Sequence, residues 1–150
     1  MKKDREEKLM PAWLELPEME HPWGNLCFGQ KQHPFPFRIE RVYYAYGIPA
    51  NANRGGHAHR VNHEVLFCLQ GGCTLWLYTP EGEEQCYRLD HPARGVLIPE
   101  MWWVELGEYV EGTLTLAVAS SPYQESDYIR NPKDFFSIEK FPDPVYRPHP

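Results

Sequence analysis

Two histidines separated by one residue, His57 and His59, are the side chains best suited to carry chemistry in this sequence. Residues i and i+2 of a β-strand point to the same face, so this spacing predicts that both imidazoles enter one pocket. Such a pair can bind a metal ion through its neutral nitrogens, or it can move protons, because histidine titrates near neutral pH. Two glycines precede the pair, which favours a built site over two unrelated surface histidines.

A carboxylate follows the pair at a suggestive distance. The spacing of His57, His59, Glu64 and Gly71 resembles the first sequence motif of the cupins, which are small double-stranded β-barrels. In metal-binding cupins a second motif adds a histidine a few residues after a Gly…Pro pair, and this sequence has Val104 there. The three residues His57, His59 and Glu64 still offer the two-histidine, one-carboxylate set that suits Fe(II) or Mn(II). A metal-dependent cupin enzyme is therefore one alternative function.

The elements that must position these residues are short strands. Fifteen prolines argue against long helices, and an aromatic content of 14% favours strands. Strands are expected at 38–46, 65–69, 73–78, 85–89, 95–99, 102–106 and 113–119. The segments 65–69 and 73–78, joined by Gln-Gly-Gly, predict a hairpin whose strands are apolar on both faces and must be covered on both sides. The pattern predicts an all-β sandwich or barrel with a cavity between its inward faces.

We expect one domain in three parts. Residues 1–36 form an N-terminal arm that packs on the barrel, residues 37–122 form the barrel, and residues 123–150 form a C-terminal helix and an extended tail. The helix is expected within 123–136, with Ser126 or Asp127 as its N-cap.

Composition excludes several classes of function. The chain has 150 residues, with 15 Lys and Arg against 21 Asp and Glu, a formal charge of −6. A net acidic chain without a basic run argues against a nucleic-acid partner. No apolar run approaches the roughly 20 residues that span a bilayer, so no membrane partner is expected. The charged start, MKKDREEKLM, lacks the apolar core of a signal peptide, and the four cysteines form no C-x-x-C pair. We expect a cytoplasmic protein with reduced thiols.

A closer resemblance covers residues from about 36 to 136. It rests on blocks that occur in order along the chain: Arg41-Val42-Tyr43-Tyr44, Arg54-Gly55-Gly56-His57-Ala58-His59-Arg60, Gly95-Val96-Leu97-Ile98-Pro99 and the stretch from Ala119 to Arg130. These blocks resemble the sugar-nucleotide 3,4-ketoisomerases, which act on dTDP-4-keto-6-deoxyglucose. The resemblance implies a cupin double-stranded β-helix (a jelly-roll-type barrel), a homodimer, an active site inside the barrel, and no cofactor or catalytic metal. It also implies a place in deoxysugar biosynthesis for bacterial surface polysaccharides.

The resemblance assigns roles to individual residues. Moving a carbonyl from C4 to C3 needs a base for the C3 proton, an enediol intermediate and a proton donor at C4. His59 is the expected base, with His57 beside it as its partner or a second acid. Tyr44 is expected to shuttle or donate a proton, and Tyr43 takes this role or a substrate contact if the register is one residue off. The plainer role for either tyrosine is sheet packing.

Other positions concern the nucleotide. Arg41 and Arg54 are expected to contact the diphosphate, because a guanidinium matches phosphate oxygens, and a surface salt bridge is the alternative. The family segment Asp-x-Arg-Gly-x-Leu reads His-Pro-Trp-Gly-Asn-Leu here, so Trp23 replaces an arginine that helps to hold substrate. Trp23 can stack on a base or a sugar but cannot neutralise phosphate. A non-catalytic nucleotide-sugar-binding cupin is therefore a further alternative.

Overall fold

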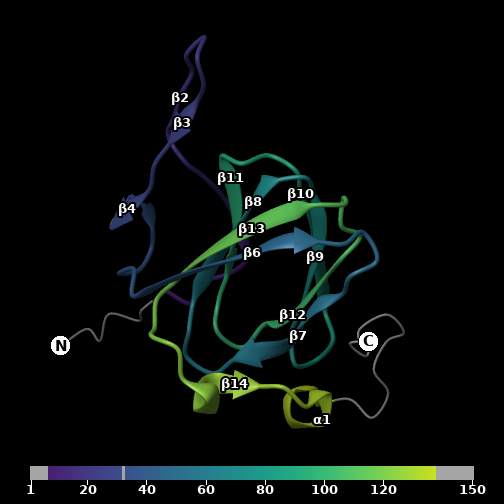
Figure 1. Ribbon diagram of the computed structural model, residues 1–150. Coiled ribbons are helices and arrows are strands. Elements are labelled where there is room, and N and C mark those ends of the chain that lie inside the picture. The colour runs from purple at the N-terminus through teal and green to yellow at the C-terminus, as the bar shows by residue number, and fades with distance from the viewer. Residues whose placement is uncertain (1–6, 32, 138–150) are drawn as a thin grey trace, which may run out of the picture.

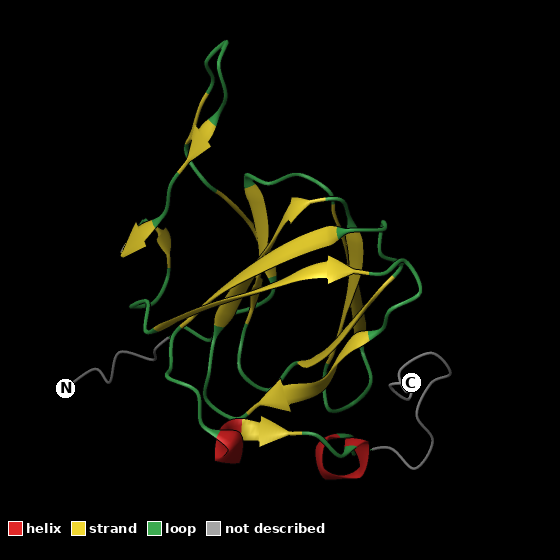
Figure 2. Ribbon diagram, in the orientation of Figure 1, coloured by secondary structure: helices red, strands yellow, loops and turns green. Residues whose placement is uncertain are grey.

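A computed structural model describes residues 7–31 and 33–137 of the chain, and in it two five-stranded antiparallel sheets face each other (Figure 1; Figure 2). The first sheet has the order β1 (Ala12–Glu15), β11 (Arg94–Ile98), β8 (Glu64–Gln70), β13 (Thr113–Ala119) and β6 (Arg41–Ile48). The second has the order β10 (Glu84–Leu89), β9 (Cys73–Tyr78), β12 (Trp103–Gly107), β7 (Arg54–His59) and β14 (Tyr128–Ile129). The predicted all-β class is confirmed.

Short elements complete the fold. The hairpin of β2 (Glu18–Met19) and β3 (Leu26–Cys27) projects away from the sheets, at the top of Figure 1, and β4 (Gln30–Lys31) pairs with β5 (Pro34–Phe35). The remaining elements are a 3₁₀ turn, η1 (Glu125–Asp127), and one α-helix, α1 (Pro132–Phe135). Within the described ranges, no helix has the length and apolar character needed to cross a membrane.

The helix predicted over 123–136 is wrong for most of that segment. Only η1 and the four-residue α1 form, with β14 between them. The residue before a proline is pushed out of the helical region, and Asn131, which precedes Pro132, is extended at φ −92° and ψ 120°. The pairing of β14 with β7 satisfies the backbone groups that a longer helix would have used.

The hairpin predicted for 65–69 and 73–78 also needs correction. Both strands form, but β8 belongs to the first sheet and β9 to the second, so the exposed turn between them leads from one sheet to the other. Each strand is covered on both faces, as its apolar residues predict. On β8, Leu66 contributes to the core between the sheets, while Val65 and Phe67 pack outward with Phe35 of the N-terminal segment. Burial on two faces explains the absence of polar alternation in β8.

The outer face of the second sheet is covered by the end of the described chain. The ring of Trp103 lies 5.6 Å from Phe135 and 5.5 Å from Phe136, centroid to centroid. The extended tail expected after this point lies outside the described residues. The N-terminal and C-terminal segments thus cover opposite faces of the sandwich.

Candidate active site

His57 and His59 share one site, as their spacing predicts. Both lie on β7, and their ring centroids are 5.1 Å apart. The pair is aimed by a bulge in β7, where Gly55 and Gly56 have φ values of +85° and +73°. The register against β12 shifts at this point, so that His57 lies opposite Val104. A bulge re-aims the side chain that follows it, which gives the two glycines a structural reason.

His59 is the buried member of the pair, with 3% of its surface exposed. Its ring packs against Tyr128 at 4.5 Å, and its Nε2 atom is buried without a hydrogen-bond partner among the described residues. Burial lowers the pKa of His59 to about 3, and the charges of His57, Arg41 and Arg130 act in the same direction. His59 is therefore a neutral imidazole at physiological pH.

Tyr43 and Glu64 form a hydrogen bond beside the histidines. The Tyr43 hydroxyl donates to Glu64 Oε2 at 2.8 Å. Tyr43 keeps 40% of its surface exposed, whereas Glu64, the acceptor of this hydrogen bond, is 3% exposed. Burial raises the pKa of Glu64, opposed by Tyr43 and Arg41, and burial together with Glu64 raises the pKa of Tyr43 well above its usual range. The phenol therefore stays protonated at physiological pH.

The structure places Tyr43, not Tyr44, at the site. Tyr44 lies on the opposite face of β6, where it is 66% exposed and 6.2 Å from the ring of Tyr46. Adjacent residues of a strand face opposite ways, so only one of the two tyrosines can enter the sandwich. The position expected for Tyr44 is therefore wrong, and Tyr43, the register alternative, stands at the site.

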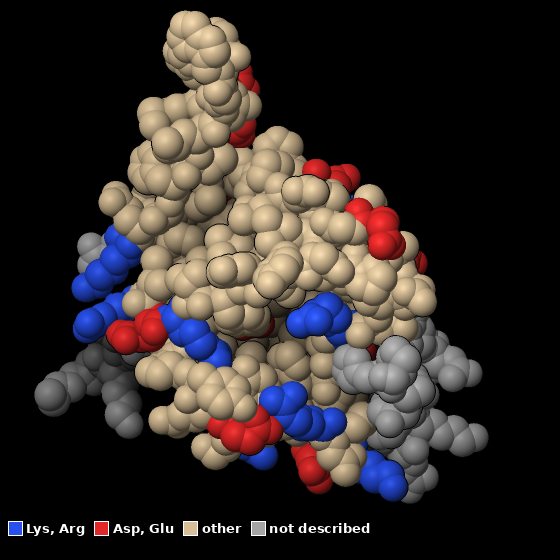
Figure 3. Space-filling view, viewed as in Figure 1, with Lys and Arg blue, Asp and Glu red and all other residues tan. Residues whose placement is uncertain are grey.

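Two cavities have Tyr43 and His57 in common. The smaller, about 80 Å³, is also lined by Arg54, Glu64 and Val104. The larger, about 370 Å³, is also lined by Arg41, Tyr123 and Tyr128. Lys and Arg side chains border the hollow at the centre of this face (Figure 3). The larger volume lies in the range of small-molecule sites, and its aromatic and guanidinium lining suits an anionic ligand with a flat or apolar part.

Sequence reasoning missed Tyr128. Its ring lies 5.1 Å from His57, and its hydroxyl accepts from Arg41 Nη1 at 3.4 Å. The residue reaches the site because β14 pairs with β7, opposite His59. Its segment has no spacing of chemical groups of its own and was expected to be helical. The signal that could have found it is the family block from 119 to 130, which ends two residues after it.

Trp23 is not brought to this site within one chain. It lies between the strands of the projecting β2–β3 hairpin and is 90% exposed, with its ring 4.8 Å from His21 (Figure 1). Of the substrate-binding residues expected from the sequence, the structure brings together Arg41, Tyr43 and Arg54, and leaves Trp23 apart.

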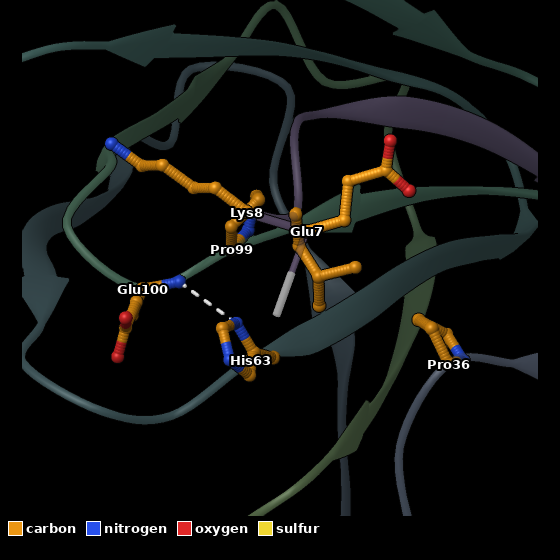
Figure 4. A pocket seen from close by; sticks show the side chains of 7 residues that line it. Glu7, Lys8, Pro36, His63, Pro99 and Glu100 are labelled. Atoms are coloured by element: carbon orange, nitrogen blue, oxygen red, sulfur yellow. Dashed lines mark hydrogen bonds between the residues drawn. The ribbon is translucent and has the colours of Figure 1, made fainter. Parts of the chain in front are cut away.

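A third cavity, of about 510 Å³, has different lining residues (Figure 4). It lies under the N-terminal segment, against Pro36 and Pro99. His63 points into it, with Nδ1 accepting from the backbone N–H of Glu100 at 3.1 Å. Neither His57 nor Tyr43 reaches this cavity, so it is separate from the histidine site.

The low pKa of His59 predicts acid sensitivity of the fold. Between about pH 3 and its ordinary pKa of 6.5, the unfolded chain binds one more proton at this residue than the folded chain. The free energy of unfolding must then fall as pH falls through this window, by up to about 1.4 kcal/mol per pH unit. Urea unfolding of wild type and His59→Gln at pH 7, 6 and 5 measures the effect. The stability of wild type relative to the variant should fall with pH, and a constant difference would contradict the assignment.

The residues of the alternative metal site also come together. One ligand atom each from His57, His59 and Glu64 lies within 4.8 Å of the others. The Glu64 carboxylate also accepts a hydrogen bond from the Tyr43 hydroxyl, and Val104, opposite His57, offers no further ligand. Two imidazoles and a carboxylate fit a divalent transition metal in donor type.

A family model and a known relative both match most of the chain. The family model described as "FdtA: WxcM-like, C-terminal" matches residues 10–140. The chain is 34% identical over 113 residues to the TDP-4-oxo-6-deoxy-alpha-D-glucose-3,4-oxoisomerase of Aneurinibacillus thermoaerophilus, covering 75% of this chain and 80% of that protein.

Solved structures are similar along most of the chain. A mutant of the 3,4-ketoisomerase QdtA from Thermoanaerobacterium thermosaccharolyticum, in complex with TDP-4-keto-6-deoxyglucose, matches with a TM-score of 0.80 and 33% identity over 83% of this chain and 90% of that one. The TDP-quinovose 3,4-ketoisomerase WlaRB of Campylobacter jejuni matches with a TM-score of 0.79 and 30% identity, over 83% and 95%. The expected cupin-like fold is shared with these isomerases. The chain belongs to the FdtA family of WxcM-like proteins.

Proposed function

We propose that this protein is a 3,4-ketoisomerase of a TDP-linked 4-keto-6-deoxyhexose. The observation that carries the proposal is the shared cavity wall of His57 and Tyr43 in a chain whose relatives are named for this reaction. An imidazole that can act as a base and a protonated phenol on one wall are the two groups that this isomerisation requires.

The reaction needs two proton transfers that balance without a redox partner. The C3–H bond breaks as the C3 proton passes to a base, and the same proton, or one exchanged with solvent, is delivered to C4. One proton also moves from the C3 oxygen to the C4 oxygen. We propose that Tyr43 takes the proton of the C3 hydroxyl as it gives its own to the C4 oxygen, so that the phenol ends unchanged.

We assign the base to His57 rather than to His59. His57 lines both cavities, whereas the side chain of His59 lies behind it and is almost fully buried. A base must reach the proton that it removes, and a buried imidazole with a pKa of about 3 is a poor acceptor. His59 then supports His57 by packing rather than by accepting the substrate proton.

Arg41 and Arg54 are our candidates for the nucleotide diphosphate. Arg41 lines the larger cavity, with its Cζ atom 5.9 Å from the centroid of the Tyr123 ring. Arg54 lines the smaller cavity. A guanidinium beside an aromatic ring offers charge for phosphate and a flat surface for a base or a sugar.

The test is proton NMR of TDP-4-keto-6-deoxyglucose incubated with the protein in D₂O, before and after treatment with EDTA. We expect the C3 proton signal to disappear and a 3-keto product to form at the same rate in both samples. Ligand binding without exchange would favour the non-catalytic nucleotide-sugar-binding alternative. Loss of activity with EDTA, restored by one equivalent of Fe(II) or Mn(II), would favour a metal-dependent enzyme that uses His57, His59 and Glu64.

We also propose that the protein is a homodimer. On the outer face of β6, Val42, Tyr44 and Tyr46 are all exposed, and within the described residues β6 pairs only with β13. The projecting β2–β3 hairpin carries further exposed apolar side chains and belongs to neither five-stranded sheet. A second copy can cover both features at once, and it offers the route by which Trp23 could serve a substrate.

Sedimentation velocity checks the dimer. Wild type should sediment as a dimer, and Tyr44→Glu should move it to the monomer, because a charge would be buried in the contact. Val110→Glu, at an exposed apolar residue outside β6 and the hairpin, is the matched control and should stay dimeric. A monomeric wild type would overturn the proposal.

A cytoplasmic location is the last part of the proposal. All four cysteines are free thiols, of which Cys68 and Cys73 are buried in the core. Free thiols are typical of a reducing compartment.

A further inference from the structure

A buried carboxylate, Glu64, stands in the site without a part in the proton transfers. We infer that Glu64 is a positioning residue: its carboxylate holds the phenol oxygen of Tyr43 at the cavity wall, between the two sugar oxygens that exchange a proton. The inference rests on the proposed function and deepens it, because it assigns to Tyr43 a partner that fixes its place.

The sheet is built for this contact. Tyr43 lies on β6 and Glu64 on β8, with β13 between them. In β13, Ala117 is the register partner of Tyr43, and Ala119 is the register partner of Glu64. Side chains two strands apart can meet only if the residues between them are small, because neighbouring strands are about 4.8 Å apart. The two alanines leave the space that the phenol crosses to reach the carboxylate.

Tyr43 needs such a partner. Its strand is the edge of the sheet, and 40% of its surface is exposed, so packing alone leaves its ring room to move. The hydrogen bond of 2.8 Å to a carboxylate that is itself fixed in the core removes this freedom. In the resting site the hydroxyl hydrogen points to Glu64, so the lone pairs of the phenol oxygen face the cavity and accept from the C3 hydroxyl. As that proton arrives, the phenol's own hydrogen turns from Glu64 to the C4 oxygen.

The position of Glu64 is otherwise costly. Burying a carboxylate carries a large desolvation penalty unless charges and hydrogen bonds compensate for it. Tyr43 supplies a hydrogen bond, and the positive charge of Arg41 acts on the same carboxylate. A leucine would fill the same volume without the penalty, so the carboxylate is explained by what it holds rather than by packing.

A double-mutant cycle tests the inference in the full-length protein. Glu64→Leu should lower kcat about 10- to 100-fold with little change in KM, because a displacement of about 1 Å at a reacting group costs up to about 100-fold. Glu64→Gln keeps an acceptor for the phenol and should retain most of the activity. Tyr43→Phe with Glu64→Leu should be no slower than Tyr43→Phe alone, since Glu64 acts only through Tyr43.

Glu105 provides the matched control. It is a second buried glutamate, it accepts from Trp103 Nε1 at 2.7 Å, and it lines neither of the two cavities. Glu105→Leu should lower the melting temperature but leave kcat unchanged, which separates a loss of stability from a loss of positioning. Equal kcat in wild type and Glu64→Leu would overturn the inference but not the proposed function. So would a double variant whose fold-loss in kcat is the product of the losses in the two single variants. A wild type that leaves the C3 proton of the substrate in place would overturn it together with the proposed function.

Discussion

Replacing His57 by asparagine is expected to lower kcat for the isomerisation about 10³-fold, within the 10²- to 10⁴-fold range of a lost general base. Asparagine keeps a polar side chain of similar size but cannot take the C3 proton. Because the larger cavity is also formed by Arg41, Tyr123 and Tyr128, TDP should bind the variant with little loss. The rate of C3 proton exchange in D₂O and the Kd for TDP measure the two effects separately.

The comparison with His59→Asn decides between the two histidines. His59 packs behind His57 against Tyr128, so its replacement should lower stability and disturb His57 indirectly. Its loss of kcat should be smaller than that of His57→Asn. The opposite order, with exchange at C3 lost only in His59→Asn, would return the role of base to His59.

The fold was readable from the sequence where the pattern was unambiguous. Short β-branched and aromatic runs between turn residues indicated seven of the ten strands in the two sheets, and the histidine spacing indicated β7, but β1 and β14 were not predicted. Apolar character on both faces of β8 and β9 correctly indicated cover from two sides. The pairing partners were not readable. The Gln-Gly-Gly turn is a local hairpin signal, but β8 pairs with β11 and β13, and β9 pairs with β10 and β12. The packing of two sheets, and not the turn, decides this.

The candidate site shows the same division. The i, i+2 spacing of His57 and His59 was sufficient to bring them together, because β7 is continuous across both. The sequence did not decide whether Tyr43 or Tyr44 enters the site. The neighbouring residues of β6 are apolar on both faces, so no alternation of polar and apolar residues marks the inward face. Tyr128 was missed since its position depends on the β14–β7 pairing, a contact made far along the chain.

The glycine before the histidines is expected to be as sensitive as the histidines themselves. Gly55→Ala should destabilise the protein by about 3 kcal/mol. Part of this is the cost of a left-handed backbone, about 1–2 kcal/mol for a non-glycine residue, since φ is +85°. The rest comes from contact, because a Cβ atom on Gly55 would lie 2.6 Å from the carbonyl oxygen of Val104. Backbone atoms of the paired strand cannot move away without breaking the β7–β12 register that aims His57.

Gly47→Ala separates these two contributions. Gly47 also has a positive φ, +65°, but nothing lies within 4 Å of the Cβ that alanine would add. Urea unfolding should therefore show a loss of about 1 kcal/mol in this variant, with kcat unchanged. In Gly55→Ala the larger loss of stability should come with a fall in kcat, because the bulge that orients His57 must relax. Equal losses in the two variants, with activity intact in both, would mean that the close approach to Val104 does not constrain the site and that His57 is aimed by its neighbours on β14 alone.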